Sequence, residues 1–226
     1  MIEVKNLLCR YGDITAIRGI NFTLKNGDSM ALVGPNGAGK TTLLMSLAGH
    51  VHCQSGQIDF NGTDITDAES VKRCFSGIGL VPEGRRVFPD LTVLENLEVG
   101  GYSRPTSEQP ENLQNVFDIF PRLQGRQKQL AGSLSGGEQQ MLAFGRAMMS
   151  RPRLMLVDEL SLGLMPSVVD ECYNALKKLQ SEGIAIILVD QNSDSSMAFC
   201  SSTLIMESGY QIWHGVSNKA PESSIY

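Results

Sequence analysis

Residues 34–42 read Gly34-Pro35-Asn36-Gly37-Ala38-Gly39-Lys40-Thr41-Thr42. This run fits the pattern G-x-x-x-x-G-K-[ST], in which glycines let the backbone turn successive N–H groups around a phosphate. Residues 29–33 before it predict a short buried strand, and residues 43–48 after it predict a helix that stops at Gly49. The helix start adds free N–H donors and a partial positive charge. We therefore predict a nucleoside triphosphate site, in which Lys40 reaches the β- and γ-phosphates and the Thr41 hydroxyl ligates Mg²⁺.

The overall composition limits the class of protein. The chain has 226 residues, of which 42% are hydrophobic and 19% charged, as in an ordinary globular protein. The formal net charge of −5 gives no basic excess that would favour a nucleic-acid partner. The five cysteines lack metal-binding spacing, which favours buried, reduced thiols. The N-terminus does not resemble a signal peptide, and the longest strongly apolar run, 184–189, is too short to span a bilayer, so we expect any membrane role to come through a partner.

The rest of the chain predicts a mixed α/β fold. Residues 1–30 predict two or three antiparallel strands, and Asn61-Gly62 after the strand 56–60 predicts a hairpin. Residues 84–150 predict a mostly helical block, with a helix that opens at 90–97 and another over 112–120. Elsewhere, strands are predicted over 77–81, 154–157 and 184–189, helices over 68–74, 166–179 and 194–200, and a final hairpin over 203–213.

A second motif is Leu134-Ser135-Gly136-Gly137-Glu138-Gln139-Gln140. Ser135 and Glu138 form a capping box, which predicts the start of a helix. Gly136 and Gly137 stand at the first helical positions, where glycine costs helix stability, so we expect a packing or ligand reason for them. Free N–H groups at a glycine-rich helix start suit a phosphate.

A third motif is the buried strand 154–157, which ends in the carboxylates Asp158 and Glu159. Their side chains point different ways and can hold different roles. The three motifs in this order resemble the ATP-binding cassette (ABC) ATPases, and the resemblance covers nearly the whole chain. It implies an α/β fold with a RecA-like P-loop NTPase core, an N-terminal antiparallel β subdomain and a helical signature subdomain. It also implies a single ABC ATPase domain over 1–226, with the core and β subdomain in 1–83 and 151–226 and the helical subdomain in 84–150.

The resemblance also implies roles for the matching residues, with ATP and Mg²⁺ as the ligands. Tyr11 falls where the family stacks an aromatic ring on adenine. Asp158 matches the residue that holds Mg²⁺ through water, and Glu159 matches the general base that polarises the attacking water. The nucleotide-binding set is Tyr11, Gly34, Pro35, Asn36, Gly37, Ala38, Gly39, Lys40, Thr41 and Thr42. The signature, which in this family meets the γ-phosphate bound by the other subunit, is Leu134, Ser135, Gly136, Gly137 and Glu138. The segment 161–164 matches a loop that touches the partner subunit.

Three positions depart from the usual pattern of the family. Glu83 replaces a glutamine and is a candidate catalytic residue and Mg²⁺ ligand. Gln191 replaces a histidine and can donate a hydrogen bond to the γ-phosphate but cannot carry a proton charge. Leu160 replaces the proline after the two carboxylates, and the sequence gives no account of it. Three short motifs resemble those of the ATPases of bacterial branched-chain amino acid importers. They are V-P-E-G-R-R-x-F-P, S-L-G-L-x-P and the Gln-Asn pair at 191–192.

That subfamily implies transmembrane permease subunits, a second ABC ATPase subunit that is identical or different, and a periplasmic or extracellular solute-binding protein as an indirect partner. It implies no nucleic-acid partner. The chain would then lie at the cytoplasmic face of the inner (plasma) membrane, attached through the permease. The helical block and the loop around Glu83 would face the permease, and the segment 85–91 either docks there or packs locally.

Three other functions stay open on the sequence. A urea or short-chain amide importer would use a similar ATPase. A non-transport ABC ATPase is disfavoured by the single cassette, the lack of heptads and the acidic charge. A subunit that binds ATP but hydrolyses little is suggested by Gln191 and Leu160 and opposed by Glu159. The sequence does not identify the solute.

Overall fold

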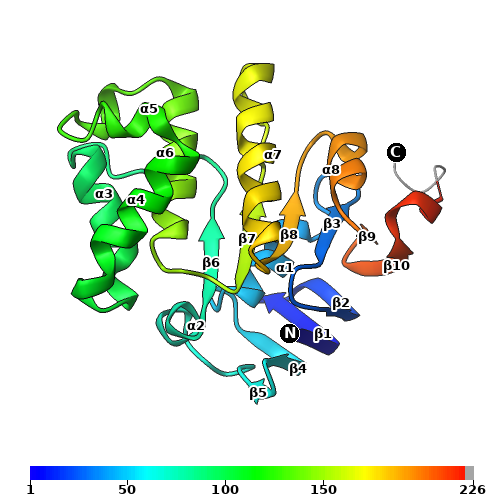
Figure 1. The fold of residues 1–226 in the computed structure, drawn as a ribbon. Coiled ribbons are helices and arrows are strands. Elements are labelled where there is room, and N and C mark those ends of the chain that lie inside the picture. The colour runs from blue at the N-terminus through cyan, green and yellow to red at the C-terminus, as the bar shows by residue number, and fades with distance from the viewer. Residues whose placement is uncertain (222–226) are drawn as a thin grey trace.

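The structure is a computed structural model that describes residues 1–221, and it contains two sheets (Figure 1). The first sheet is antiparallel, with strand order β2-β1-β4-β5. Its strands are β1 (Ile2–Tyr11), β2 (Ile14–Leu24), β4 (Cys53–Phe60) and β5 (Thr63–Asp64). The predicted N-terminal strands and the hairpin at Asn61-Gly62 are therefore confirmed.

The second sheet holds the core of the molecule, with strand order β10-β9-β3-β8-β7-β6. Its strands are β3 (Ser29–Val33), β6 (Ile78–Val81), β7 (Leu154–Asp158), β8 (Ala185–Val189), β9 (Ser202–Glu207) and β10 (Tyr210–Val216). All of them run parallel except β10, which pairs antiparallel with β9. Every residue of β3, β7 and β8 is buried, as expected for strands covered on both faces. The loops that follow these strands consequently meet at one edge of the sheet, where α/β proteins bind ligands.

Helices cover the parallel sheet and form a separate group beside it (Figure 1). The sheet is associated with α1 (Lys40–Leu47), α2 (Ser70–Ser76), α7 (Pro166–Ser181) and α8 (Ser193–Phe199). The group beside the sheet consists of α3 (Val93–Gly100), α4 (Gln109–Ile119), α5 (Pro121–Gln124) and α6 (Gly136–Met148). This group is the mostly helical block predicted from the sequence. The boundaries at 84 and 150 stay a prediction, because one hydrophobic core runs from α3, α4 and α6 into β7 and α7.

Two local predictions inside the helical block were wrong in their bounds. The helix predicted to open at Asp90 begins at Val93, because the Thr92 hydroxyl caps it by accepting a hydrogen bond from the Glu95 N–H at 3.2 Å. The helix predicted over 112–120 begins earlier, as α4 at Gln109, after short 3₁₀ turns at Gly101–Ser103 and Thr106–Glu108. Pro110 lies in the first turn of α4, where proline is tolerated.

Two other expectations concern the thiols and the membrane. All five cysteines are free thiols, and four of them are buried, as their spacing predicted. Within residues 1–221, no helix combines the length and the apolar character that a membrane crossing requires.

Candidate functional site

The phosphate loop occupies the turn between β3 and α1, where two glycines are required by the fold. Gly34 has φ +145°, and a Cβ there would clash with the carbonyl oxygen of Met206. Gly39 has φ +102°, and a Cβ there would lie 2.7 Å from the carbonyl oxygen of Ala16. No side chain caps the start of α1 at Gly39. The first N–H groups of that helix therefore suit a bound phosphate.

Lys40 lies at the start of α1 and is folded over its own loop. Its Nζ donates hydrogen bonds to the carbonyl oxygens of Gly34 at 2.8 Å and Pro35 at 3.0 Å. Burial lowers the pKa of Lys40, and the negative charges of Glu159 and Asp158 oppose that shift. These two carbonyl groups hold the ammonium against the phosphate loop, in a side chain that lines the cavity described below. Its contact with the β- and γ-phosphates stays a prediction.

Thr41 and Asp158, two of the residues predicted to hold Mg²⁺, lie within hydrogen-bonding distance of each other, and the metal site itself stays a prediction. The Thr41 hydroxyl donates to Asp158 Oδ1 at 3.3 Å, and Asp158 Oδ2 is buried with no hydrogen-bond partner. Burial, followed by the charge of Glu83, raises the pKa of Asp158. A buried carboxylate oxygen without a partner is costly, and a hard divalent cation is a ligand that compensates it. Within residues 1–221, no group of three or more His, Cys, Asp or Glu side chains is arranged to hold a metal. Phosphate and water oxygens would therefore complete the Mg²⁺ sphere.

Glu159 follows Asp158 in the chain and lines the cavity at the phosphate loop. Its backbone is left-handed, with φ +55°, which costs on the order of 1–3 kcal/mol for a residue other than glycine. Its N–H donates to the Val189 carbonyl oxygen at 3.0 Å, while Oε2 is buried without a partner. Burial, Asp158, Asp190 and Glu83 all raise the pKa of Glu159. A carboxylate in these surroundings is a stronger base than an ordinary glutamate.

A cavity of about 390 Å³ lies at the carboxyl edge of the parallel sheet, and Lys40 and Glu159 line it whereas Thr41 and Asp158 do not. Its lining consists of Val33, Gly34, Pro35, Asn36, Lys40, Glu159, Asp190, Gln191 and Ser193. The structure thus brings the loop, the predicted base and Gln191 together. Glu83 is exposed in the loop after β6, close enough for its charge to act on Asp158 and Glu159.

Tyr11 does not line that cavity. It ends β1, pairs with Ile14 of β2 and has 52% of its surface exposed. Further along β2, Ala16 and Ile17 approach Gly39 of the phosphate loop. An exposed aromatic ring near that end of the strand pair is compatible with adenine stacking, which stays a prediction.

The sequence pattern did not single out Asp190, which organises the loops around the cavity. Its buried carboxylate accepts hydrogen bonds from the Ser161 N–H at 3.2 Å, the Ser161 hydroxyl, the Gln191 N–H at 2.8 Å and the Tyr173 hydroxyl at 3.0 Å. It therefore joins the loop after β7 to the loop after β8. The available signal was a charged residue at the end of the buried strand β8, the same signal that identified Asp158 on β7.

The signature forms the start of α6, and its capping box is confirmed. The Ser135 hydroxyl accepts from the Glu138 N–H at 3.3 Å, and Arg126 Nε lies 2.8 Å from Glu138 Oε1. A Cβ on Gly137 would lie 2.8 Å from a methyl group of Val168, so the expected packing reason exists. No signature residue lines the cavity at the phosphate loop. Within residues 1–221, the signature therefore lies outside the chain's own phosphate site.

Leu160, which the sequence left without an account, is fully buried in the hydrophobic core shared by α6 and α7. An apolar side chain fits this position because the chain turns inward after Glu159.

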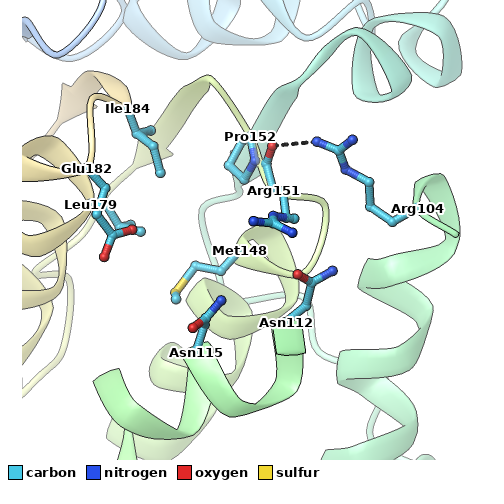
Figure 2. A pocket seen from close by; sticks show the side chains of 9 residues that line it. All are labelled: Arg104, Asn112, Asn115, Met148, Arg151, Pro152, Leu179, Glu182 and Ile184. Carbon is cyan, nitrogen blue, oxygen red and sulfur yellow. Dashed lines mark hydrogen bonds between the residues drawn. The ribbon is translucent and has the colours of Figure 1, made fainter. Parts of the chain in front are cut away.

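A second cavity, of about 350 Å³, lies between the helical block and the C-terminal end of α7 (Figure 2). It is lined by Arg104, Asn112, Asn115, Met148, Arg151, Pro152, Leu179, Glu182 and Ile184. Arg104 Nη2 donates to the Arg151 carbonyl oxygen at 2.9 Å (Figure 2). None of the predicted site residues lines this cavity, so the chemistry belongs to the cavity at the phosphate loop.

This fold and site define a P-loop nucleotide-binding protein, and comparison with known proteins agrees. The sequence matches the ABC transporter family over residues 17–161. It is 40% identical over 214 residues to the high-affinity branched-chain amino acid transport ATP-binding protein BraG of Pseudomonas aeruginosa, across 95% of this chain and 92% of that protein. It is 32% identical over 223 residues to the probable branched-chain amino acid transport ATP-binding protein LivF of Archaeoglobus fulgidus, across 98% and 94%.

Solved structures share the fold. The ADP conformation of an ATP-binding cassette of an ABC transporter superposes with a TM-score of 0.84 at 25% identity, covering 100% of this chain and 92% of that one. A dimeric cassette in a post-hydrolysis state bound to ADP and Pi gives a TM-score of 0.85 at 22% identity, covering 96% and 99%. The chain belongs to the ABC transporter family as an ATP-binding cassette that hydrolyses ATP.

Proposed function

We propose that this chain is the ATP-hydrolysing subunit of a membrane importer for branched-chain or related amino acids. The observation that carries the proposal is the meeting of Lys40, the Thr41–Asp158 pair, Glu159 and Gln191 at one edge of the sheet. Two relatives that align over nearly the whole chain are named as branched-chain amino acid transport ATP-binding proteins, which supports the solute class.

The chemistry that these residues support is phosphoryl transfer to water, which depends on positioning and charge stabilisation. Lys40 and the N–H groups of the loop hold the phosphates, and Glu159 accepts the proton of the attacking water. Gln191 donates a hydrogen bond to the γ-phosphate. Thr41, Asp158 and Glu83 would hold Mg²⁺, which neutralises phosphate charge when it is bound.

We infer that the complete site needs a second cassette. The signature would meet the γ-phosphate held by the partner's phosphate loop, and the dimeric relative bound to ADP and Pi supports two-chain assembly. A lone chain should bind ATP and hydrolyse it poorly. The partner is a second copy or a related ATPase.

We also propose that the permease docks in a groove of about 840 Å³ between α2, the loop after β6 and the helical block. Phe88 and Val99 in this groove are 44% and 47% exposed, and the Arg146 guanidinium lies 5.0 Å from the centre of the Phe88 ring. Apolar side chains left exposed around a groove favour a protein partner. Arg86 and Phe88 of the 85–91 segment line this groove and would then be part of that interface. The chain would lie at the cytoplasmic face of the plasma membrane. The helical subdomain at 84–150 would be its permease-facing and signature-bearing part.

The first test is ATP hydrolysis by the wild-type chain and by Glu159→Gln. We expect Glu159→Gln to bind ATP normally, to accumulate as an ATP-bound dimer and to hydrolyse at least a hundredfold more slowly, because removing one catalytic group typically has effects of this order. Equal low rates in both proteins would refute the catalytic assignment.

The second test is purification of the wild-type chain from native membranes. Recovery of two multi-span subunits and a second cassette is expected, and recovery of only soluble proteins would overturn the transport role. The solute-binding protein of the same system, titrated with leucine, isoleucine, valine and urea, identifies the solute class.

A further inference from the structure

Arg85, in the loop between β6 and α3, covers the first residue of the signature helix. A Cβ on Gly136 would lie 3.0 Å from both Nη1 and Nη2 of Arg85 and 3.1 Å from Cζ. A Cβ on Gly163 would lie 3.9 Å from Nη2. The guanidinium group therefore lies flat against the start of α6 and faces the loop that follows β7. Gly136 is the smallest residue and leaves the space that this group fills.

The backbone of the loop fixes Arg85 in this position. Arg85 and the following Arg86 both have left-handed backbones, with φ +65° and +44°. The carbonyl oxygen of Arg85 accepts a weak hydrogen bond from Arg146 Nη2 of α6 at 3.5 Å, and the Arg146 guanidinium lies over the Phe88 ring. The loop that carries Arg85 is thus attached to the same helix that its guanidinium covers.

In the part of the chain that the structure describes, the charge of Arg85 has no partner. Among residues 1–221, no carboxylate lies within ion-pairing distance of its guanidinium, and its side chain donates no hydrogen bond. The nearest signature acid, Glu138, is already bound to Arg126 and to Ser135. The start of α6 therefore combines a free guanidinium with the N–H groups of a glycine-rich first turn, and both favour an anion.

We propose that Arg85 is a ligand of the ATP bound by the partner cassette. In the two-chain site of the proposed function, on which this inference rests, its guanidinium binds the γ-phosphate beside Ser135 and the N–H groups of Gly136 and Gly137. A guanidinium offers phosphate oxygens two parallel N–H donors, which an ammonium group does not. Arg85 therefore contributes to its partner's nucleotide and leaves the affinity of its own phosphate loop unchanged.

The test compares Arg85→Ala and Arg85→Lys with the wild type. Arg151→Ala is the matched control, because it removes the same charge just beyond the other end of α6. Among the described residues, the ion pairs of Arg151 are with Glu108 and Glu111 on the surface. Binding of a fluorescent ATP analogue to each isolated chain reports the phosphate loop, and we expect affinities within twofold of the wild type. ATP-driven dimerisation is measured by sedimentation in the Glu159→Gln background.

We expect Arg85→Ala to raise the dimer dissociation constant about ten- to a hundredfold, the usual effect of losing hydrogen bonds to a charged group. Arg85→Lys should have a dimer dissociation constant between those of the wild type and Arg85→Ala, and Arg151→Ala should have that of the wild type. Dimerisation of Arg85→Ala equal to the wild type would overturn the inference. If ATP does not dimerise the wild-type chain with itself, the same variants are compared in the complex that the wild-type chain recovers from membranes, by its ATPase rate. A wild-type chain that binds no ATP would instead refute the proposed function.

Mixing of two variants that are each impaired in hydrolysis distinguishes action on the partner from action on the same chain. Lys40→Ala cannot bind ATP but presents Arg85, whereas Arg85→Ala binds ATP but lacks the guanidinium. Their mixed dimer contains one complete site, so hydrolysis should recover well above that of either variant alone. Absence of recovery, with mixed dimers present by sedimentation, would show that Arg85 acts within its own chain and would overturn the inference.

Discussion

Replacing Tyr173 by phenylalanine tests whether Asp190 organises the loops around the phosphate site. Tyr173 lies in α7, is 9% exposed, and donates its hydroxyl to Asp190 Oδ2 at 3.0 Å. Phenylalanine keeps the ring and its edge-on contact with Phe199 at 5.5 Å between ring centres, so the hydroxyl is the only group lost. A hydrogen bond to a charged group contributes about 1.5–3 kcal/mol, and we expect the free energy of unfolding to fall by that amount. For a chain of this length the melting temperature should fall by roughly 3–12 °C.

The assay is urea unfolding followed by circular dichroism, with ATP hydrolysis measured on the same samples. Tyr102→Phe is the control, because Tyr102 is 83% exposed and its hydroxyl is free in solvent. In the Tyr173→Phe background, Asp190→Asn should lower the free energy of unfolding by less than it does in the wild type. The reason is that burying an amide requires less free energy than burying a carboxylate that has lost a hydrogen-bond donor. A free energy of unfolding of Tyr173→Phe within about 0.5 kcal/mol of the wild type, the usual size of a surface-substitution effect, would refute the reasoning. Strictly additive effects of the two substitutions would also refute it.

Lys40→Ala should lose ATP binding and hydrolysis together, and a nucleotide affinity within a few-fold of the wild type in a calorimetric titration would contradict the phosphate-loop assignment. Asp158→Asn should abolish Mg²⁺-dependent hydrolysis and yet raise the melting temperature of the nucleotide-free chain, because burial raises the pKa of Asp158 and its charge opposes folding. A carboxyl whose pKa is raised by folding destabilises the wild type as pH rises through that pKa, because the buried group then becomes charged. The difference in melting temperature between Asp158→Asn and the wild type should therefore shrink on acidification, and a pH-independent difference would contradict this prediction. Leu160→Ala should lower the free energy of unfolding, measured in urea, by about 2–5 kcal/mol and Leu160→Met by less than about 1.5 kcal/mol, because the side chain is fully buried. Equal small effects of the two substitutions would contradict close packing around Leu160.

Local sequence patterns predicted the parts of the site that local chemistry determines. The phosphate loop, the capping box at Ser135 and the carboxylates after β7 each lie in one short stretch with its own physical signature. Leu160, which stands where the family usually has proline, had no local explanation, because its burial depends on contacts with α6 and α7 and not on its neighbours in the sequence.

The groups that the sequence did not reveal act between loops. Asp190 matters because Ser161 and Tyr173 happen to donate to it, and Arg85 matters because the loop after β6 folds back on α6. Neither contact has a spacing or a composition that marks it in one dimension. The predicted start of α3 was wrong for a different reason, because the Thr92–Glu95 capping box that marks Val93 as the first helical residue lies inside the stretch predicted as helix.

The absence of every signature residue from the cavity around Lys40 has a consequence for how the protein behaves when it is scarce. If half of each working site comes from another molecule, turnover per molecule falls on dilution, in the manner of a second-order process. Copies that have not found their transporter then hold nucleotide without consuming it. A cell would be able to make this subunit in excess of its membrane partners without draining its ATP, and the timing of assembly would itself act as the control on fuel use.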